Sequence, residues 1–224
     1  MPATTRSSLE RLQDRLDKDI SWRKKEISAL RASSANDQES RKHIYRAGLV
    51  MLCAHWEGFL RCSLQFYLEH VFSHRLSIKD LAPEFVAIYY FQDVIKAASA
   101  KSPGTEQHHL RLAKRILEGN DIKCTKPSWK VETGANPSSI VTSALSIDLG
   151  LDKQLGLDGA AWTTTKVFID EQILKVRNQV AHGEGRLVNH DEFTEASERV
   201  VAMCDKLSSL IICAATKKTY RSRN

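Results

Sequence analysis

The chain has 224 residues, of which 42% are hydrophobic and 27% are charged, and it contains ten glycines and five prolines. A chain of this length can bury a core without disulfides, and so few glycines and prolines disfavour a β-sandwich or barrel. No apolar run approaches the roughly 18 residues of a membrane span. The formal net charge of +6 favours polyanions as partners.

The five cysteines are widely scattered and form no CxxC pair. This pattern suggests neither a zinc site nor a disulfide framework. The N-terminal segment has no apolar stretch after a basic start, so no secretory signal is expected. We therefore expect reduced cysteines in a cytoplasmic protein that uses no metal and no cofactor.

Helical periodicity predicts the first two elements. Leucine and isoleucine recur at helical spacing from Ser8 to Arg31, and Ser7 or Ser8 can cap the start of that helix. Polar turn formers at 32–39 separate it from a long second helix, predicted at Ser40–Ser73. An apolar stripe of this second helix should face partners in a bundle, and it carries Leu49, Leu52, Trp56, Phe59 and Phe66.

The middle of the chain predicts three shorter helices and one irregular segment. Two of the helices are expected at Pro83–Ala100 and His108–Leu117. The segment 119–137 contains two glycines and two prolines and is rich in lysine, so it is predicted to be a long basic loop. An Asn-Pro pair at 136–137 resembles an N-cap followed by the first helical residue, which predicts a short helix ending near Leu149.

Two helices close the chain. The first is predicted at Thr163–His182, with Gly183 ending it and a narrow buried stripe formed by Ile169, Ile173, Val176 and Val180. The second is predicted at Asp191–Ala215, with a buried face formed by Phe193, Val200, Met203, Leu207, Leu210 and Ala214.

The predicted fold class is all-α, because no credible strand pair and no internal repeat are found. It is a helical bundle with long central helices and a basic loop insertion. We expect residues 1–39 to form a helix and linker that pack on the bundle, residues 40–216 to form the main domain, and residues 217–224 to form a basic tail.

The most informative segment is Val-Arg-Asn-Gln-Val-Ala-His-Gly at 176–183. On a helix, Asn178 and His182 lie about 40° apart on one face, away from the predicted core stripe. Arg177 lies about 140° from His182, so its side chain is expected to bend toward that histidine or toward an equivalent site on a second copy of the chain. At the end of the helix, His182 also meets the negative end of the helix dipole, which favours its protonated form.

These residue types suit cleavage of a phosphodiester by the neighbouring 2′-hydroxyl. Such a reaction needs a proton-transfer group, which His182 supplies, and a cation for the phosphoryl oxygens, which the planar guanidinium of Arg177 supplies. Asn178 can orient the phosphate or the histidine. The structural alternative is that His182 only precedes a helix-ending glycine and that Arg177 and Asn178 are solvated.

Two sequence motifs resemble those of a known family. Arg177-Asn178-Gln179-Val180-Ala181-His182 resembles the R-N-x-x-x-H signature of the HEPN superfamily. The segment 54–59, Ala-His-Trp-Glu-Gly-Phe, resembles the A-H-W-E-G-F segment of the MAE-type HEPN-like nucleases, and the stretch 136–151 is similar to the segment that precedes the last helix pair in that group. The resemblance covers roughly residues 40 to 215.

The resemblance implies a HEPN-type helical bundle that forms a homodimer, in which two R-N-x-x-x-H segments meet at one RNA-cleaving cleft. It also implies a toxin or effector of a bacterial antiviral or toxin–antitoxin system, with a possible antitoxin or other partner protein. The catalytic candidates are Arg177, Asn178 and His182. The alternative function is a non-catalytic HEPN module that binds RNA, a nucleotide or a partner protein through the same helix face.

Other residues carry weaker hypotheses. Glu57 lies off the apolar stripe and either orients Arg177 or His182 or forms a plain salt bridge. His55 and Glu57 stand about 200° apart on a helix, so joint metal binding is not expected, and His55 is expected between helices. A basic face with Arg111, Lys114 and Arg115 either contacts RNA or is solvated.

Overall fold

The structure, a computed structural model, describes residues 6–33, 42–100 and 107–222. Within these residues the fold is all-α, and the only β pairing consists of two isolated bridges, Ser77 with Lys123 and Leu81 with Arg221. In chain order, the helices are α1 (Ser8–Ser33), α2 (Lys42–Ser73), η1 (Ile78–Asp80), α3 (Pro83–Ser99), α4 (His108–Leu117), α5 (Ser139–Asp148), α6 (Gly159–Val167), η2 (Phe168–Leu174), α7 (Lys175–Ala181) and α8 (His190–Lys217).

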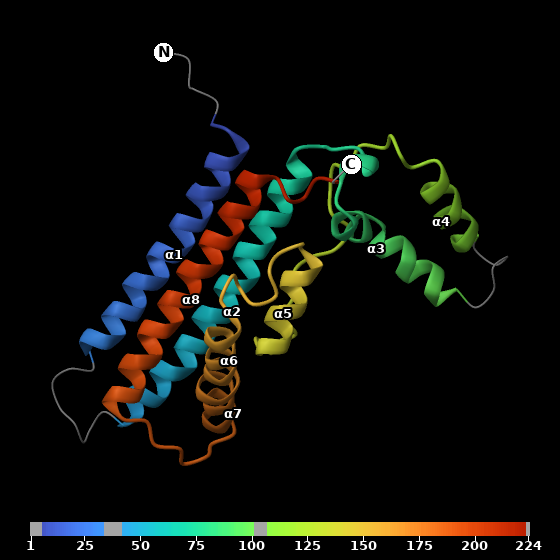
Figure 1. Cartoon of the computed structure of the whole chain (residues 1–224). Coiled ribbons are helices and arrows are strands. Elements are labelled where there is room, and N and C mark those ends of the chain that lie inside the picture. The colour runs from blue at the N-terminus through green and yellow to red at the C-terminus, as the bar shows by residue number, and fades with distance from the viewer. Residues whose placement is uncertain (1–5, 34–41, 101–106, 223–224) are drawn as a thin grey trace.

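Three long helices form the centre of the molecule. Figure 1 shows α1, α2 and α8 lying side by side along most of their length, and each contacts the other two. The predicted stripe of α2 is the heart of the core, since Leu52, Trp56 and Phe59 are at most 1% exposed. Burial of these large apolar side chains is the main force that joins the three helices. In these described regions, no helix is both long and apolar enough to span a membrane.

The starts of α1 and α8 are fixed by side-chain caps. The Ser7 hydroxyl accepts a hydrogen bond from the Glu10 N–H, and the Glu10 carboxylate accepts one from the Ser7 N–H. The same reciprocal pair joins Asn189 and Glu192 at the start of α8. Each pair satisfies two backbone N–H groups that have no partner within the helix. The predicted cap at Ser7 is confirmed, and the predicted break at 32–39 lies mostly outside the described residues.

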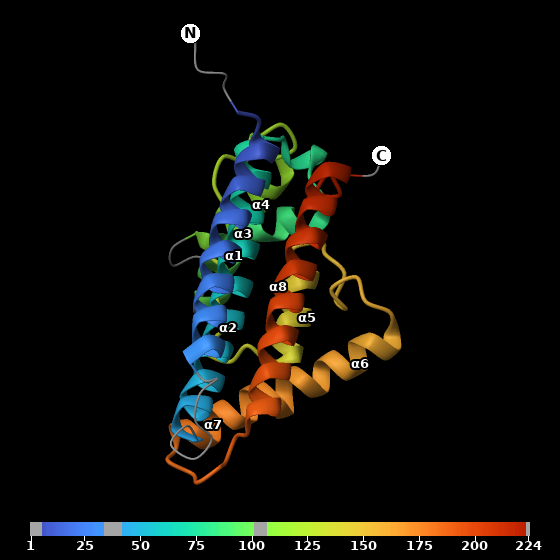
Figure 2. The ribbon, with the colours of Figure 1, turned by 90° about the vertical axis from the view of Figure 1, so that its left-hand side faces the viewer.

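The short helices α3 and α4 lie at the end of the bundle far from α7 (Figures 1 and 2). Arg115 joins them, because it forms an ion pair with Asp93 and its carbonyl oxygen accepts a hydrogen bond from the Tyr90 hydroxyl. The C-terminal segment docks at the same end. Its Tyr220 is 1% exposed, so the predicted basic tail is anchored rather than frayed as far as Ser222, whose N–H donates to the carbonyl of Asp80.

The predicted start of α5 was wrong by two residues. The N-cap is Ser138, whose hydroxyl accepts from the N–H of Val141, and Pro137 precedes the cap. Asn136 instead closes a turn through its N–H to the carbonyl of Thr133. The irregular basic segment before this helix is present as predicted, and the end of the helix at Asp148 agrees with the expected position.

The helix that carries the R-N-x-x-x-H motif differs from its predicted form in two ways. It begins at Gly159 rather than Thr163, because the Asp158 carboxylate accepts from the N–H of Ala161 and caps it. It also contains a π-helical segment, η2, in which the N–H of Lys175 donates to the carbonyl of Asp170, five residues back. Figure 2 shows the continuous run α6–η2–α7 crossing the bundle at an angle. The predicted stripe is otherwise confirmed, with Val180 only half-buried.

Candidate functional site

Asn178 and His182 lie side by side on the solvent-facing side of α7. Both are exposed, whereas Val176 on the opposite face is 5% exposed. They line a shallow hollow of about 430 Å³ together with Asp170, Glu171, Leu174, Lys175, Gln179 and Glu184. No core contact requires a histidine or an asparagine at these two positions, so packing does not explain them.

The end of α7 sets the orientation of His182. The N–H of Glu184 donates to the carbonyl of Gln179 at 2.9 Å, and the N–H of Gly183 donates to that of Val180 at 3.1 Å. This pair of bonds is a Schellman motif, which requires a residue in the left-handed region after the cap. Gly183 supplies it with a φ of +77°. His182 is therefore the C-cap residue of α7.

Charge in the hollow is predominantly negative. Three carboxylates line it, from Asp170, Glu171 and Glu184, and Lys175 is paired with Glu171 at 2.7 Å. Asp170 is also engaged, because it accepts hydrogen bonds from Ser139. An RNA phosphate that enters this hollow therefore needs a cation from beside it or from another molecule.

Arg177 is directed to the inner side of the helix rather than toward His182. It is half-buried, and its Nη2 donates to the carbonyl oxygen of Ala135 at 2.7 Å. Its positive charge acts on the thiol of Cys53 in α2. Burial raises the pKa of the Cys53 thiol, and the charge of Arg177 opposes that rise. The structure thus brings Asn178 and His182 together and places Arg177 one step around the helix, against α2.

Glu57 lies on the same side as Arg177. Its Oε1 accepts a hydrogen bond from the Thr133 hydroxyl at 2.5 Å, and its negative charge adds to the rise in the pKa of the Cys53 thiol that burial causes. The contact with Thr133 was not foreseen, because the two residues are 76 positions apart and the segment around Thr133 has no periodicity. Asp170 was also missed, since its place in the hollow depends on a π-helical segment that no sequence pattern announces.

Two other residues of the 54–59 motif, His55 and Gly58, pack against α1 in the interior of the bundle. His55 is 4% exposed, and its Nε2 lies 3.2 Å from Glu26 Oε2 in α1, without the alignment of a hydrogen bond. Gly58 provides space for the buried guanidinium of Arg23, because a Cβ at this position would lie 2.8 Å from Arg23 Nη1. His55 thus lies between helices, as expected.

The basic residues of α4 are not part of this site. Arg111 and Lys114 are exposed on α4, at the opposite end of the molecule from α7 (Figure 1). Arg115 is half-buried, and its guanidinium lies over the Tyr89 ring at 5.2 Å in addition to its ion pair with Asp93. A contact between RNA and this face remains a hypothesis for Arg111 and Lys114, whereas Arg115 is already used within the chain.

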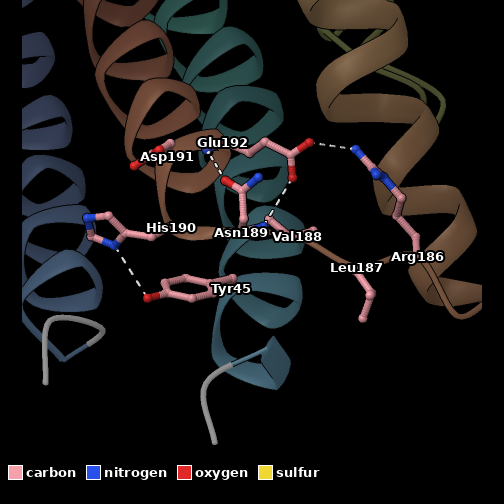
Figure 3. A pocket seen from close by; sticks show the side chains of 8 residues that line it. All are labelled: Tyr45, Arg186, Leu187, Val188, Asn189, His190, Asp191 and Glu192. Carbon is pink, nitrogen blue, oxygen red and sulfur yellow. Dashed lines mark hydrogen bonds and ion pairs between the residues drawn. The ribbon is translucent and has the colours of Figure 1, made fainter. Parts of the chain in front are cut away.

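A second hollow, of about 490 Å³, lies at the start of α8 (Figure 3). The Tyr45 hydroxyl lies 3.3 Å from His190 Nδ1, and Arg186 forms an ion pair with Glu192 at 2.9 Å. Arg46 holds the loop between α7 and α8 through a 2.7 Å hydrogen bond to the carbonyl of Glu184. These contacts fix the loop that follows His182.

In the parts of the chain that the structure describes, no group of three or more His, Cys, Asp or Glu side chains is arranged to hold a metal ion.

Comparisons with known proteins identify a family. A search of curated proteins and a search of solved structures gave no match. A family model described as HEPN_MAE_28990/-like HEPN matches residues 12–220, from the first turns of α1 to the docked tail. The chain therefore belongs to the HEPN_MAE_28990/-like HEPN family.

Proposed function

We propose that this protein is a metal-independent endoribonuclease that cleaves RNA by attack of the 2′-hydroxyl on the adjacent phosphorus. Membership of the HEPN family points to a nuclease or an RNA-related module. The observation that carries the proposal is the exposed pair Asn178 and His182, which the fold itself does not use. The resemblance of the motifs further suggests a toxin or effector in a bacterial antiviral or toxin–antitoxin system, regulated by a partner protein.

The chemistry assigns a role to each side chain. The 2′-oxygen loses its proton and bonds to phosphorus, the bond from phosphorus to the 5′-oxygen breaks, and that oxygen takes up a proton. His182 exchanges protons with one of these oxygens. Asn178 orients the phosphate, and the guanidinium of Arg177 stabilises the charge on the phosphoryl oxygens. The products carry a 2′,3′-cyclic phosphate and a 5′-hydroxyl.

A homodimer completes this site. The reaction needs one group that accepts a proton and another that donates one, and each chain contributes a single motif histidine. Two copies related by a two-fold axis, with their α7 helices facing each other, bring two His182 side chains to one cleft. The composite site thus accounts for the exposure of Asn178 and His182 in a single chain.

The proposal is tested with labelled single-stranded RNA in the presence of EDTA, comparing the wild type with His182→Ala. We expect cleavage by the wild type alone, with 2′,3′-cyclic phosphate and 5′-hydroxyl ends, and a loss of about 10²- to 10⁴-fold in the variant. Cleavage that disappears in EDTA would contradict metal independence. Equal cleavage by both proteins would assign the activity to another residue or a contaminant.

The acidic lining of the hollow supports one alternative, a non-catalytic module that binds a basic partner. In that case the wild type cleaves none of several unrelated RNAs. Binding of the partner would then weaken when Asp170 or Glu171 is neutralised, because the carboxylates rather than His182 provide the recognition.

A further inference from the structure

The segment from Thr133 to Ser139, here termed the strap, is tied to the site at three points. The Thr133 hydroxyl donates to Glu57 of α2 at 2.5 Å, and the carbonyl of Ala135 accepts from Arg177 of α7 at 2.7 Å. At its far end, the N–H and hydroxyl of Ser139 donate to the two oxygens of Asp170 in η2 at 2.8 and 2.5 Å. The strap therefore joins α2, η2 and α7, the helices that carry the candidate site.

The tip of the strap, Gly134 and Ala135, has an unusual backbone conformation. Gly134 and Ala135 have φ values of +62° and +56°, so two consecutive residues adopt the left-handed region. Alanine rarely adopts that conformation, and it persists only where surrounding contacts hold it. Both tip residues are exposed, whereas Thr133 is 6% exposed. The hydrogen bond from Thr133 to Glu57 thus anchors the residue directly before the strained tip, and the tip presents the Ala135 carbonyl to Arg177.

Arg177 has a long, flexible side chain and several N–H donors in a planar fork. The strap engages one nitrogen, Nη2, through the Ala135 carbonyl. This contact fixes the direction of the fork, and a guanidinium with five N–H donors has others left for a phosphoryl oxygen. Donors that are already in position stabilise developing charge without having to rearrange. The position of the strap therefore determines how well Arg177 stabilises the charge on the phosphoryl oxygens.

We propose that Thr133 is a positioning residue, which anchors the strap through Glu57 so that the Ala135 carbonyl holds the Arg177 guanidinium in place for phosphoryl-oxygen stabilisation. The inference rests on the proposed nuclease function. It extends that function to a segment which carries none of the motif residues. Thr133 acts through Glu57 and the strap and does not itself touch the RNA.

Two substitutions separate the hydroxyl from the rest of the side chain. Thr133→Val keeps the shape and removes the donor, whereas Thr133→Ser keeps the donor. We expect kcat for RNA cleavage to fall about tenfold in Thr133→Val with less than a twofold change in KM, and to stay within twofold of the wild type in Thr133→Ser. Far-UV circular dichroism and the unfolding midpoint of each variant check that the bundle is folded.

A second measurement does not depend on cleavage. Hydrogen exchange of the Asn136 amide, which donates to the Thr133 carbonyl and closes the tip, should accelerate at least tenfold in Thr133→Val and stay near the wild-type rate in Thr133→Ser. The same amide should also exchange faster in Arg177→Met, since this variant removes the tie to the Ala135 carbonyl.

The outcomes distinguish this inference from the proposed function. If the wild type cleaves RNA and Thr133→Val cleaves equally well, the positioning role is wrong while the nuclease stands. Equal losses in the Val and Ser variants would assign the effect to packing and overturn the role of the hydroxyl. If the wild type cleaves no RNA, the proposed function fails and the positioning role fails with it. The exchange rates then still decide whether Thr133 anchors the strap.

Discussion

The two sequence motifs of this protein are used in opposite ways. The motif at 54–59 faces the interior, where His55 lies against α1 and Gly58 leaves room for Arg23. The motif at 177–182 ends on the surface, where Asn178 and His182 contact solvent in a shallow hollow. Glu57 of the first motif and Arg177 of the second meet the same segment, the strap, because Glu57 bonds Thr133 and Arg177 bonds the Ala135 carbonyl.

The first motif therefore contributes to the stability of the fold, whereas the exposed residues of the second, Asn178 and His182, do not pack in the core. Substitutions in the first motif should reduce stability because they disturb buried partners. Substitutions at the exposed pair should leave stability unchanged, since surface changes away from special features usually stay within about 0.5 kcal/mol. Unchanged stability on removal of Asn178 and His182 would leave binding or chemistry as the role of this exposed pair.

The largest effect on stability is expected for Gly58→Leu. The new side chain would displace the Arg23 guanidinium, which is 6% exposed and bonded to Asp19 and to the carbonyl of His55. Separating a buried ion pair and overpacking the α1–α2 contact should lower the free energy of unfolding by about 3 kcal/mol. Urea unfolding measures this, with Gly159→Ala as a control because no heavy atom lies within 4 Å of its Cβ position. Equal midpoints for Gly58→Leu and the control would contradict the interior role.

A smaller effect is expected for Gly183→Ala. Gly183 is exposed and directly follows His182, but its backbone conformation shapes the end of α7. A Cβ there meets open space, so only the positive φ opposes it. The strain should cost about 1 kcal/mol. It should also displace His182, and cleavage should fall more than the stability loss explains. Unchanged cleavage would show that the Schellman turn does not orient the histidine.

The pH dependence of stability tests whether His55 belongs to the interior. Burial lowers the pKa of His55 below its usual 6.5, while the Glu26 carboxylate opposes that change. The unfolded chain then binds more protons than the folded one below pH 6.5. The stabilisation is therefore complete above that value and is lost as the pH falls toward the lowered pKa. Urea midpoints between pH 7.5 and 5.5 should show a weaker decline in His55→Gln than in the wild type.

The smallest effect is expected on α4. The double variant Arg111→Ala, Lys114→Ala removes two exposed charges far from α7. If this face contacts RNA phosphates, affinity should fall a few-fold at low salt and the salt dependence of binding should become shallower by about two counterions. If the face is only solvated, filter binding will show no change at any salt concentration.

The sequence predicted the helical bundle well because apolar periodicity is a local pattern that burial enforces. It predicted α4 at His108–Leu117 and the cap at Ser7. It failed where distant partners decide the backbone. The π-helical turn before α7 and the ties between Thr133 and Glu57 and between Ala135 and Arg177 depend on contacts across the fold. The exposed pair could be located from helix geometry, but the direction of Arg177 could not, because a flexible side chain follows its acceptors.

The central claim is that His182 performs chemistry while His55 supports the fold, and one paired measurement tests it most directly. His182→Ala and His55→Ala are assayed in parallel for single-turnover RNA cleavage and for the urea midpoint. We expect His182→Ala to lose cleavage and to keep the wild-type midpoint. We expect His55→Ala to have a lower midpoint and to retain cleavage per folded molecule. A drop in midpoint for His182→Ala, or full cleavage by it, would show that the two histidines do not have these separate roles.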